Sequence, residues 1–149
     1  MRRVPSRTNM KKILFMAGFA VVAFGFLFRP SVLRAQGAAG EYPNLSPAEV
    51  REVLGKRSGD PDFVLLDVRT RKEFDAERIA GAVIVDYNSP SFRDEIGKLD
   101  REKTYLVYCR TGNRTKGALK VMQEMGFRNL LHLADGITGW KEAGFPTAR

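Results

Sequence analysis

Four short apolar runs recur along the chain, at residues 63–66, 82–85, 105–109 and 130–133. Apart from His132 in the last run, their side chains do not alternate between polar and apolar as they would in a strand with one wet face. Continuous runs of Leu, β-branched and aromatic residues are typical of strands covered on both faces, which occur mainly in parallel sheets. The runs therefore predict a buried, mainly parallel sheet.

Stretches with helical signatures alternate with these runs. Two of them open with a capping box, at residues 46–49 and 70–73. In a capping box, Ser or Thr and a Glu three positions later accept hydrogen bonds from backbone N–H groups that are otherwise free at the helix start. Further helices are predicted to begin at Ser91, at Asn113 or Arg114, and after Gly136. Such alternation with short connections calls for an α/β fold with helices on both sides of the sheet. In such sheets functional groups gather at the carboxyl ends of the strands.

The net charge of +8 is unevenly distributed along the 149 residues. Residues 1–35 hold seven Lys or Arg and no acidic residue, so residues 36–149 hold 25 − 7 = 18 basic against 17 acidic side chains. A net charge of +1 over this larger part gives no electrostatic footprint for a polyanion, so nucleic acid is not an expected partner. The length suits one domain after the basic segment.

The basic segment has the pattern of an export signal. Residues 1–12 carry five Lys or Arg, and residues 13–28 are all apolar or glycine. This pattern is typical of a signal peptide; an uncleaved anchor is the alternative, although sixteen helical residues span only about 24 Å of a hydrocarbon core of about 30 Å. We expect residues 1–39 to be a signal peptide or membrane anchor with its linker, and residues 40–149 to form an exported, periplasmic or otherwise extracytoplasmic domain. Membrane contact is expected only through residues 13–28.

The lone cysteine, Cys109, ends the third apolar run and is followed by a short loop and a predicted helix. Gly112 can adopt positive φ, which lets successive backbone N–H groups point to one centre. The helix N-terminus, Arg110 and Arg114 add positive charge, and such surroundings lower the pKa of a thiol. An inert, buried cysteine is the alternative, but it would not explain two arginines and a glycine in the next five positions. We therefore predict a nucleophilic thiolate that needs no metal or cofactor.

Several segments together resemble the rhodanese-like domains, in their single-domain form. The resemblance runs from about Ser46 to Pro146 and rests on the segments LLDVR at 65–69, IAGA at 79–82, CRTGNR at 109–114 and GITGW at 136–140. It implies a three-layer sandwich with a central, mainly parallel five-stranded sheet flanked by helices. It also implies a sulfurtransferase in which Cys109 takes a sulfane sulfur as a persulfide and passes it to a thiol or cyanide acceptor.

The resemblance also implies roles for the residues around Cys109. The backbone of residues 110–114, which includes Thr111, Gly112 and Asn113, would cradle the persulfide. Asp67 and Arg69 match the acid and the arginine near the pocket of the family, and Arg69 would attract a small anionic donor such as thiosulfate. Asp67 has an equally good alternative as a helix cap or the partner of an arginine. Thr111 stands where members that use thiosulfate often have lysine, which predicts weak thiosulfate binding.

Three other interpretations remain open at this point. Related phosphatases have five residues between the cysteine and the arginine of the loop, whereas four separate Cys109 from Arg114 here, so the smaller loop favours a single sulfur atom. The chain could also be a non-catalytic binding module, or a sulfur carrier for one specific protein. His132 lies in an apolar run, and we expect it to be a hydrogen-bonded interior or edge histidine rather than a base for Cys109.

The export prediction can be tested separately from the chemistry. Residues 1–45 fused to a reporter that is active only outside the cytoplasm should give signal, because the five cations hold the N-terminus inside while the apolar run crosses the membrane. Reporter activity in whole cells is the measurement, and a fusion that remains inactive and cytoplasmic would contradict the assignment.

Overall fold

The central sheet has five parallel strands in the order β1-β5-β4-β2-β3. The computed structural model describes residues 42–149, in which the strands are β1 (Asn44–Leu45), β2 (Phe63–Asp67), β3 (Val83–Ile84), β4 (Thr104–Tyr108) and β5 (Leu130–Leu133). The predicted fold class is confirmed, and all four apolar runs contain a strand. The additional strand, β1, is only two residues long and pairs with β5 at the edge of the sheet.

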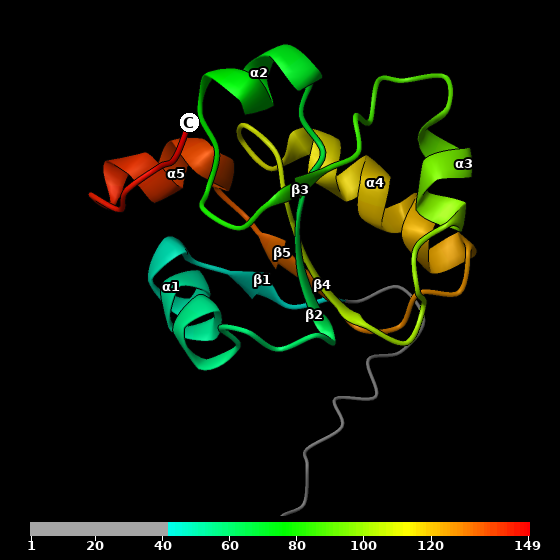
Figure 1. Cartoon of the computed structure of the whole chain (residues 1–149), viewed down its shortest axis with the longest axis horizontal. Coiled ribbons are helices and arrows are strands. Elements are labelled where there is room, and N and C mark those ends of the chain that lie inside the picture. Colours follow the sequence, from blue (N-terminus) through cyan, green and yellow to red (C-terminus); the bar gives the residue numbers. More distant parts are fainter. Residues whose placement is uncertain (1–41) are drawn as a thin grey trace, which may run out of the picture. The chain divides into compact units, whose positions relative to one another are not determined.

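Helices cover both faces of the sheet (Figure 1). They are α1 (Pro47–Lys56), α2 (Arg71–Ala76), α3 (Phe92–Gly97), α4 (Asn113–Glu124) and α5 (Gly136–Glu142). One apolar core joins α3 and α4 to the sheet face that carries Tyr105 and Val107, and a second joins α1 and α5 to the face that carries Leu106 and Tyr108. Successive residues of β4 thus enter opposite cores, which is why its sequence is apolar throughout.

The predicted helix starts agree with the structure. Both capping boxes are formed, at Ser46 for α1 and at Thr70 for α2, and α4 begins at Asn113, directly after Gly112. The strand β4 ends one residue before the predicted run does, so Cys109 is the first residue of the loop rather than the last of the strand. This places the sulfur at the carboxyl edge of the sheet, where α2, α4 and α5 begin.

The predicted leader at residues 1–39, with its membrane-contacting residues 13–28, lies outside the described residues. Within residues 42–149, no helix combines the length and the apolar character that crossing a membrane requires.

The side chain of Glu73 ties α2 to the start of α4. Its carboxylate accepts hydrogen bonds from the backbone N–H and the hydroxyl of Thr70, at 3.0 and 2.9 Å, and completes the capping box of α2. The same carboxylate pairs with both terminal nitrogens of Arg114, at 2.7 and 2.8 Å. Hydrogen bonds from Arg114, assisted by those from Thr70, hold the pKa of Glu73 at about 2 despite partial burial. One carboxylate therefore positions two elements 41 residues apart in the sequence.

We expect Glu73→Gln to lower the free energy of unfolding at pH 7 by about 1–2 kcal/mol, because it removes the charge that Arg114 and Thr70 bind. A partly solvated pair contributes less than the full pKa shift implies. Since the folded-state pKa lies below the ordinary 4.5, this stability is present above pH 4.5 and is lost as the pH falls towards 2. The difference in free energy of unfolding between the parent protein and Glu73→Gln, measured by urea titration, should therefore narrow as the pH falls from 4.5 towards 2.

The matched control is Glu49→Gln, which changes the same position of the capping box on α1, where the carboxylate accepts hydrogen bonds only from Ser46 among the described residues. It should cost less stability than Glu73→Gln. A difference between Glu73→Gln and the parent protein that stays constant from pH 7 to pH 2 would rule out the carboxylate charge as its origin.

Candidate active site

Cys109 lies at the centre of the carboxyl edge of the sheet, between the ends of β5 and β2. Its side chain is 1% exposed, and it belongs to the core cluster that joins α4 to the sheet. The loop of residues 109–112 carries the chain from β4 into α4. The lone cysteine is therefore buried, as the inert alternative requires, and the groups that surround it decide whether it is reactive.

Backbone N–H groups converge on the sulfur. The N–H of Gly112 donates a hydrogen bond to Sγ at 3.2 Å, and Gly112 has a φ of 88°, as its predicted positive φ requires. A side chain at this position would also overlap the carbonyl oxygen of Ala134. Only glycine combines this backbone conformation with this close approach, so Gly112 fixes the direction of its own N–H.

Burial and hydrogen bonding have opposite effects on the pKa of Cys109. Burial, the largest single influence, raises the pKa, whereas donors from Thr115, Thr111 and Gly112 lower it, and their sum leaves the pKa below the ordinary value for a thiol. The Thr115 hydroxyl is itself buried near the sulfur and makes no other hydrogen bond among residues 42–149. It is therefore free to donate to Sγ once the thiol ionises. Its position in the first turn of α4 was not predicted to be part of the site.

The first turn of α5 holds the loop from the other side. The N–H of Ile137 donates to the carbonyl of Cys109 at 2.9 Å, and the N–H of Thr138 donates to that of Arg110 at 3.1 Å. Gly136 allows this contact, because a Cβ at its position would overlap the carbonyl group of Arg110. The carbonyl of Arg110 shares its peptide group with the N–H of Thr111, so its hydrogen bond to α5 helps to turn that N–H towards the sulfur. The GITGW segment was predicted as a short helix, but not as a support for the loop.

The three arginines predicted for the site have different environments. Arg69 is 3% exposed and pairs with the fully buried Asp67 at 2.7 Å, while its Nη2 also donates to the carbonyl of Glu77. Asp67 is therefore the partner of an arginine, one of its two expected roles. Arg114 is held by Glu73, and its guanidinium also faces Cys109. The Arg110 side chain is exposed and has no hydrogen-bond or ion-pair partner within the described part of the chain.

His132 lies beneath the loop, closer to the site than its position in an apolar run indicated. Its Nδ1 is hydrogen-bonded to the side-chain oxygen of Asn44 in β1, at 2.7 Å. Its Nε2 is buried without a partner in the part of the chain that is described, 3.3 Å from where a Cβ on Gly112 would be. Burial, reinforced by the charge of Lys116, lowers the pKa of His132 and keeps the ring neutral. The ring is a hydrogen-bonded interior histidine, as expected, and it also packs under the loop.

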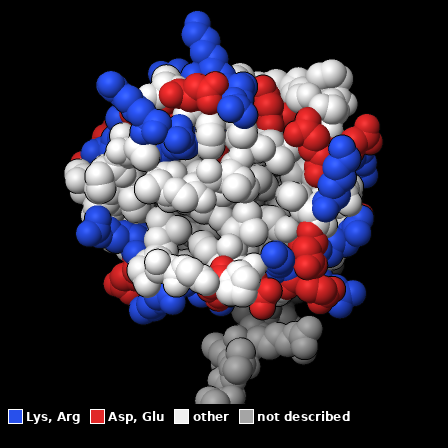
Figure 2. Space-filling view, in the orientation of Figure 1, with Lys and Arg blue, Asp and Glu red and all other residues white. Residues whose placement is uncertain are grey.

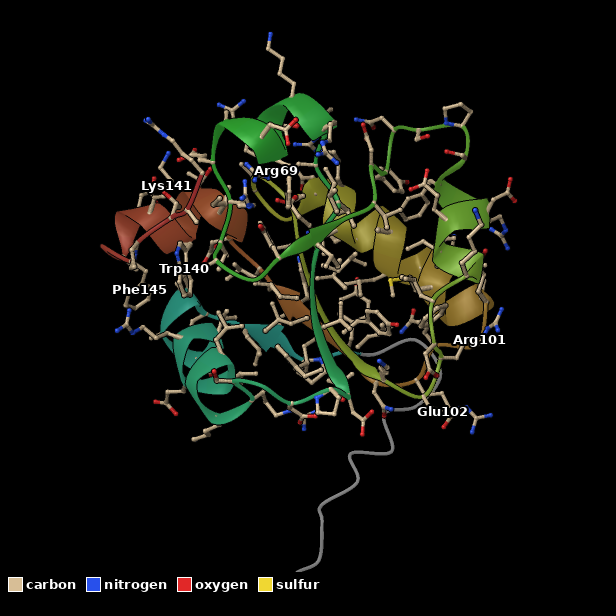
Figure 3. The ribbon with its side chains drawn as sticks, viewed as in Figure 1. Arg69, Arg101, Glu102, Trp140, Lys141 and Phe145 are labelled. Atoms are coloured by element: carbon tan, nitrogen blue, oxygen red, sulfur yellow. The ribbon has the colours of Figure 1, made fainter. Side chains whose placement is uncertain are left out.

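A cleft of about 460 Å³ opens beside the loop, between α2 and α5. Arg69 and Arg110 line it from the ends of β2 and β4, Glu73 and Glu77 from α2 and the residue after it, and Lys141 and Glu142 from α5. Figure 3 shows Arg69 and Lys141 on the α2 side of the molecule, with Arg101 and Glu102 at the opposite end. Charged side chains of both signs are interspersed around the rim of the face in Figure 2, with uncharged residues in its middle.

No group of three or more His, Cys, Asp or Glu side chains suited to a metal ion occurs among residues 42–149. The donors gathered at Cys109 are N–H groups, a hydroxyl and a guanidinium. Such groups stabilise an anion rather than bind a cation.

The chain is similar to several known proteins. The thiosulfate sulfurtransferase GlpE of Coxiella burnetii is 32% identical over 107 residues, which make up 72% of this chain and 94% of that protein. The probable adenylyltransferase/sulfurtransferase MoeZ of Mycobacterium tuberculosis is 32% identical over 106 residues, but the match spans only 26% of its length. Among solved structures, a rhodanese-related protein from Thermoplasma volcanium superposes with a TM-score of 0.61 at 27% identity, over 72% of this chain and 98% of that one.

The sequence profile of the rhodanese-like domain matches residues 50–143, from the middle of α1 to the end of α5. This range includes the strand ends, the Cys109 loop and the α5 turn that supports it. The chain therefore belongs to the rhodanese-like domain family, a family that includes sulfurtransferases.

Proposed function

We propose that this protein is a sulfurtransferase that accepts a sulfane sulfur on Cys109 as a persulfide and transfers it to a thiol or to cyanide. The observation that carries the proposal is the hydrogen bond from the Gly112 N–H to the buried Sγ, in a loop whose carbonyls are bound to α5. The likeness to a thiosulfate sulfurtransferase over nearly its whole length supports the same chemistry.

The reaction takes place in two substitutions at sulfur. In the first, the Cys109 thiolate attacks the sulfane sulfur of the donor, an S–S bond forms, and the donor's own S–S bond breaks with its electron pair leaving on the departing anion. In the second, the acceptor attacks the outer sulfur of the persulfide, and the electron pair of the breaking S–S bond returns to Cys109. Neither step changes the total oxidation level, so no external oxidant or reductant is required.

The loop N–H groups and the Thr115 hydroxyl stabilise negative charge at every stage. The charge lies on Sγ in the thiolate and is shared with the outer sulfur in the persulfide anion. Donors fixed before the reaction need no reorganisation as that charge moves. Because Arg69 is bound to Asp67 and Glu77, Arg110 has the freer guanidinium for an anionic donor. This arrangement and Thr111 both favour weak binding of thiosulfate.

We also propose that the domain acts outside the cytoplasm. The support is the sequence of residues 1–39, with five cations before an unbroken run of sixteen apolar or glycine residues.

We expect Cys109→Ser to abolish sulfur transfer while leaving the protein folded, because a hydroxyl cannot hold a sulfane sulfur. After incubation with thiosulfate or an organic persulfide, the intact mass of the parent protein should rise by one sulfur that a reductant removes, and the variant should gain none. A mass gain of one sulfur on the serine variant, or undiminished thiosulfate:cyanide activity, would eliminate the mechanism.

We expect Thr115→Val to raise the pKa of Cys109, because it removes a hydrogen bond to the thiolate, and a hydrogen bond to a charged group contributes about 1.5–3 kcal/mol. Valine has the shape of threonine, so the buried site remains filled. The rate of iodoacetamide alkylation as a function of pH measures this pKa.

The control is Thr111→Val, which removes an exposed hydroxyl but keeps the backbone N–H that faces the sulfur. Its alkylation profile should match that of the parent protein. Coincident profiles for all three proteins would show that the Thr115 hydroxyl does not stabilise the thiolate.

A further inference from the structure

We propose that the cleft between α2 and α5 binds the ammonium and carboxylate groups of a zwitterionic thiol, an amino-acid thiol or a short peptide, which receives the sulfur from Cys109. This inference rests on the proposed function and adds the class of acceptor to it. The residues assigned to recognition are Arg110 and Lys141 for the carboxylate, and Glu77 and Glu142 for the ammonium group.

The size of the cleft is the first argument. Its volume of about 460 Å³ lies within the range of sites for small organic molecules, about 300–1,000 Å³. At about 30 Å³ for each water molecule, it has room for about fifteen waters. Thiosulfate has five heavy atoms and cyanide has two, so either would leave most of the cleft filled with water. A thiol with the dimensions of an amino acid or a short peptide uses more of this space.

The charge of the cleft is the second argument. Three basic residues (Arg69, Arg110 and Lys141) and three acidic residues (Glu73, Glu77 and Glu142) line it, so it has no net charge with which to attract a small dianion. Two of the six are neutralised by partners that do not line the cleft, Arg69 by Asp67 and Glu73 by Arg114. The charges left for a ligand are thus two positive and two negative, which a zwitterion complements.

The accessibility of these four groups is the third argument. The side chains of Arg110 and Glu142 have no hydrogen-bond or ion-pair partner within residues 42–149, and both residues are exposed. Lys141 and Glu77 pair at 2.8 Å across the cleft, but their side chains are 49% and 34% exposed. An exposed pair of this kind contributes only about 0–1 kcal/mol, so a ligand that offers both charges can replace it at little cost.

The position of the cleft makes the sulfur transfer possible. Arg110, which lines the cleft, follows Cys109 directly, while Lys141 and Glu142 line it from the end of α5. A thiol held by its charged groups is therefore kept beside the loop. Its thiolate attacks the outer sulfur of the Cys109 persulfide and forms a new S–S bond, which converts the acceptor thiol into a persulfide. The electron pair of the broken S–S bond returns to Sγ of Cys109. The proton of the acceptor thiol goes to solvent.

The experiment compares four acceptor thiols on one persulfidated protein. The full chain is loaded on Cys109 and checked by intact mass, then mixed with L-cysteine, cysteamine, 3-mercaptopropionate or 2-mercaptoethanol. For each thiol, the rate of sulfur loss from Cys109 is converted to a second-order rate constant based on the concentration of the ionised thiol. This corrects for the different pKa values of the four thiols. We expect the constant for L-cysteine to exceed those for the other three by about fivefold or more, and Lys141→Gln and Glu142→Gln each to lower the ratio of L-cysteine to 2-mercaptoethanol.

Matched controls are Arg93→Gln and Glu124→Gln, which break an exposed ion pair between α3 and α4 and should leave this ratio as it is. Failure of Cys109 to gain sulfur from any donor would overturn the proposed function and this inference together. A persulfide that forms and is discharged at equal rates per thiolate by all four thiols would overturn the inference alone. A ratio that is equal in the parent protein and in both α5 variants would also overturn it.

Discussion

The hydrogen bonds from the first turn of α5 to the carbonyls of Cys109 and Arg110 are the contacts on which the rest of the site depends. A peptide group has a donor and an acceptor on opposite sides, so fixing the carbonyl also fixes the direction of the N–H. With the carbonyl of Arg110 bound outward, the N–H of Thr111 in the same peptide group faces the sulfur, which also accepts a hydrogen bond from the N–H of Gly112. Gly136 and Gly112 permit the two close approaches that this arrangement needs.

The site consequently has less net positive charge than its three arginines would give if they were unpaired. The charge of Arg69 is neutralised by Asp67, and that of Arg114 by Glu73. What stabilises a thiolate here is mainly a set of oriented dipoles and a hydroxyl, with Arg114 nearby but already paired. Oriented dipoles act over a short range and favour a charge at one point, whereas free cations would attract any anion from solution. A sulfur bonded to the protein benefits fully from such a site, while a diffusing dianion gains much less.

The sequence alone predicted the sheet, the helix starts and the loop that follows Cys109, because each of these has a local signal. Apolar runs, capping boxes and a cysteine followed by Gly112 and two arginines are all visible within a few residues. The contacts that complete the site join distant segments and have no such signal. The pairing of Glu73 with Arg114 spans 41 residues, and β1 is recognisable only through its pairing with β5, since two residues show no periodicity. Thr115 could have been found by extending the loop motif one position, into the turn of α4 that faces the sulfur.

The burial of Cys109 also limits which reagents can reach its sulfur. A thiol that is 1% exposed reacts slowly with bulky or adventitious oxidants, even when its pKa is lowered. In the proposed reaction, an S–S bond of about 2.05 Å would separate the added sulfur from Sγ. The four residues between Cys109 and Arg114, against five in related phosphatases, favour a single added sulfur atom over a tetrahedral oxyanion, and this remains a prediction from the sequence.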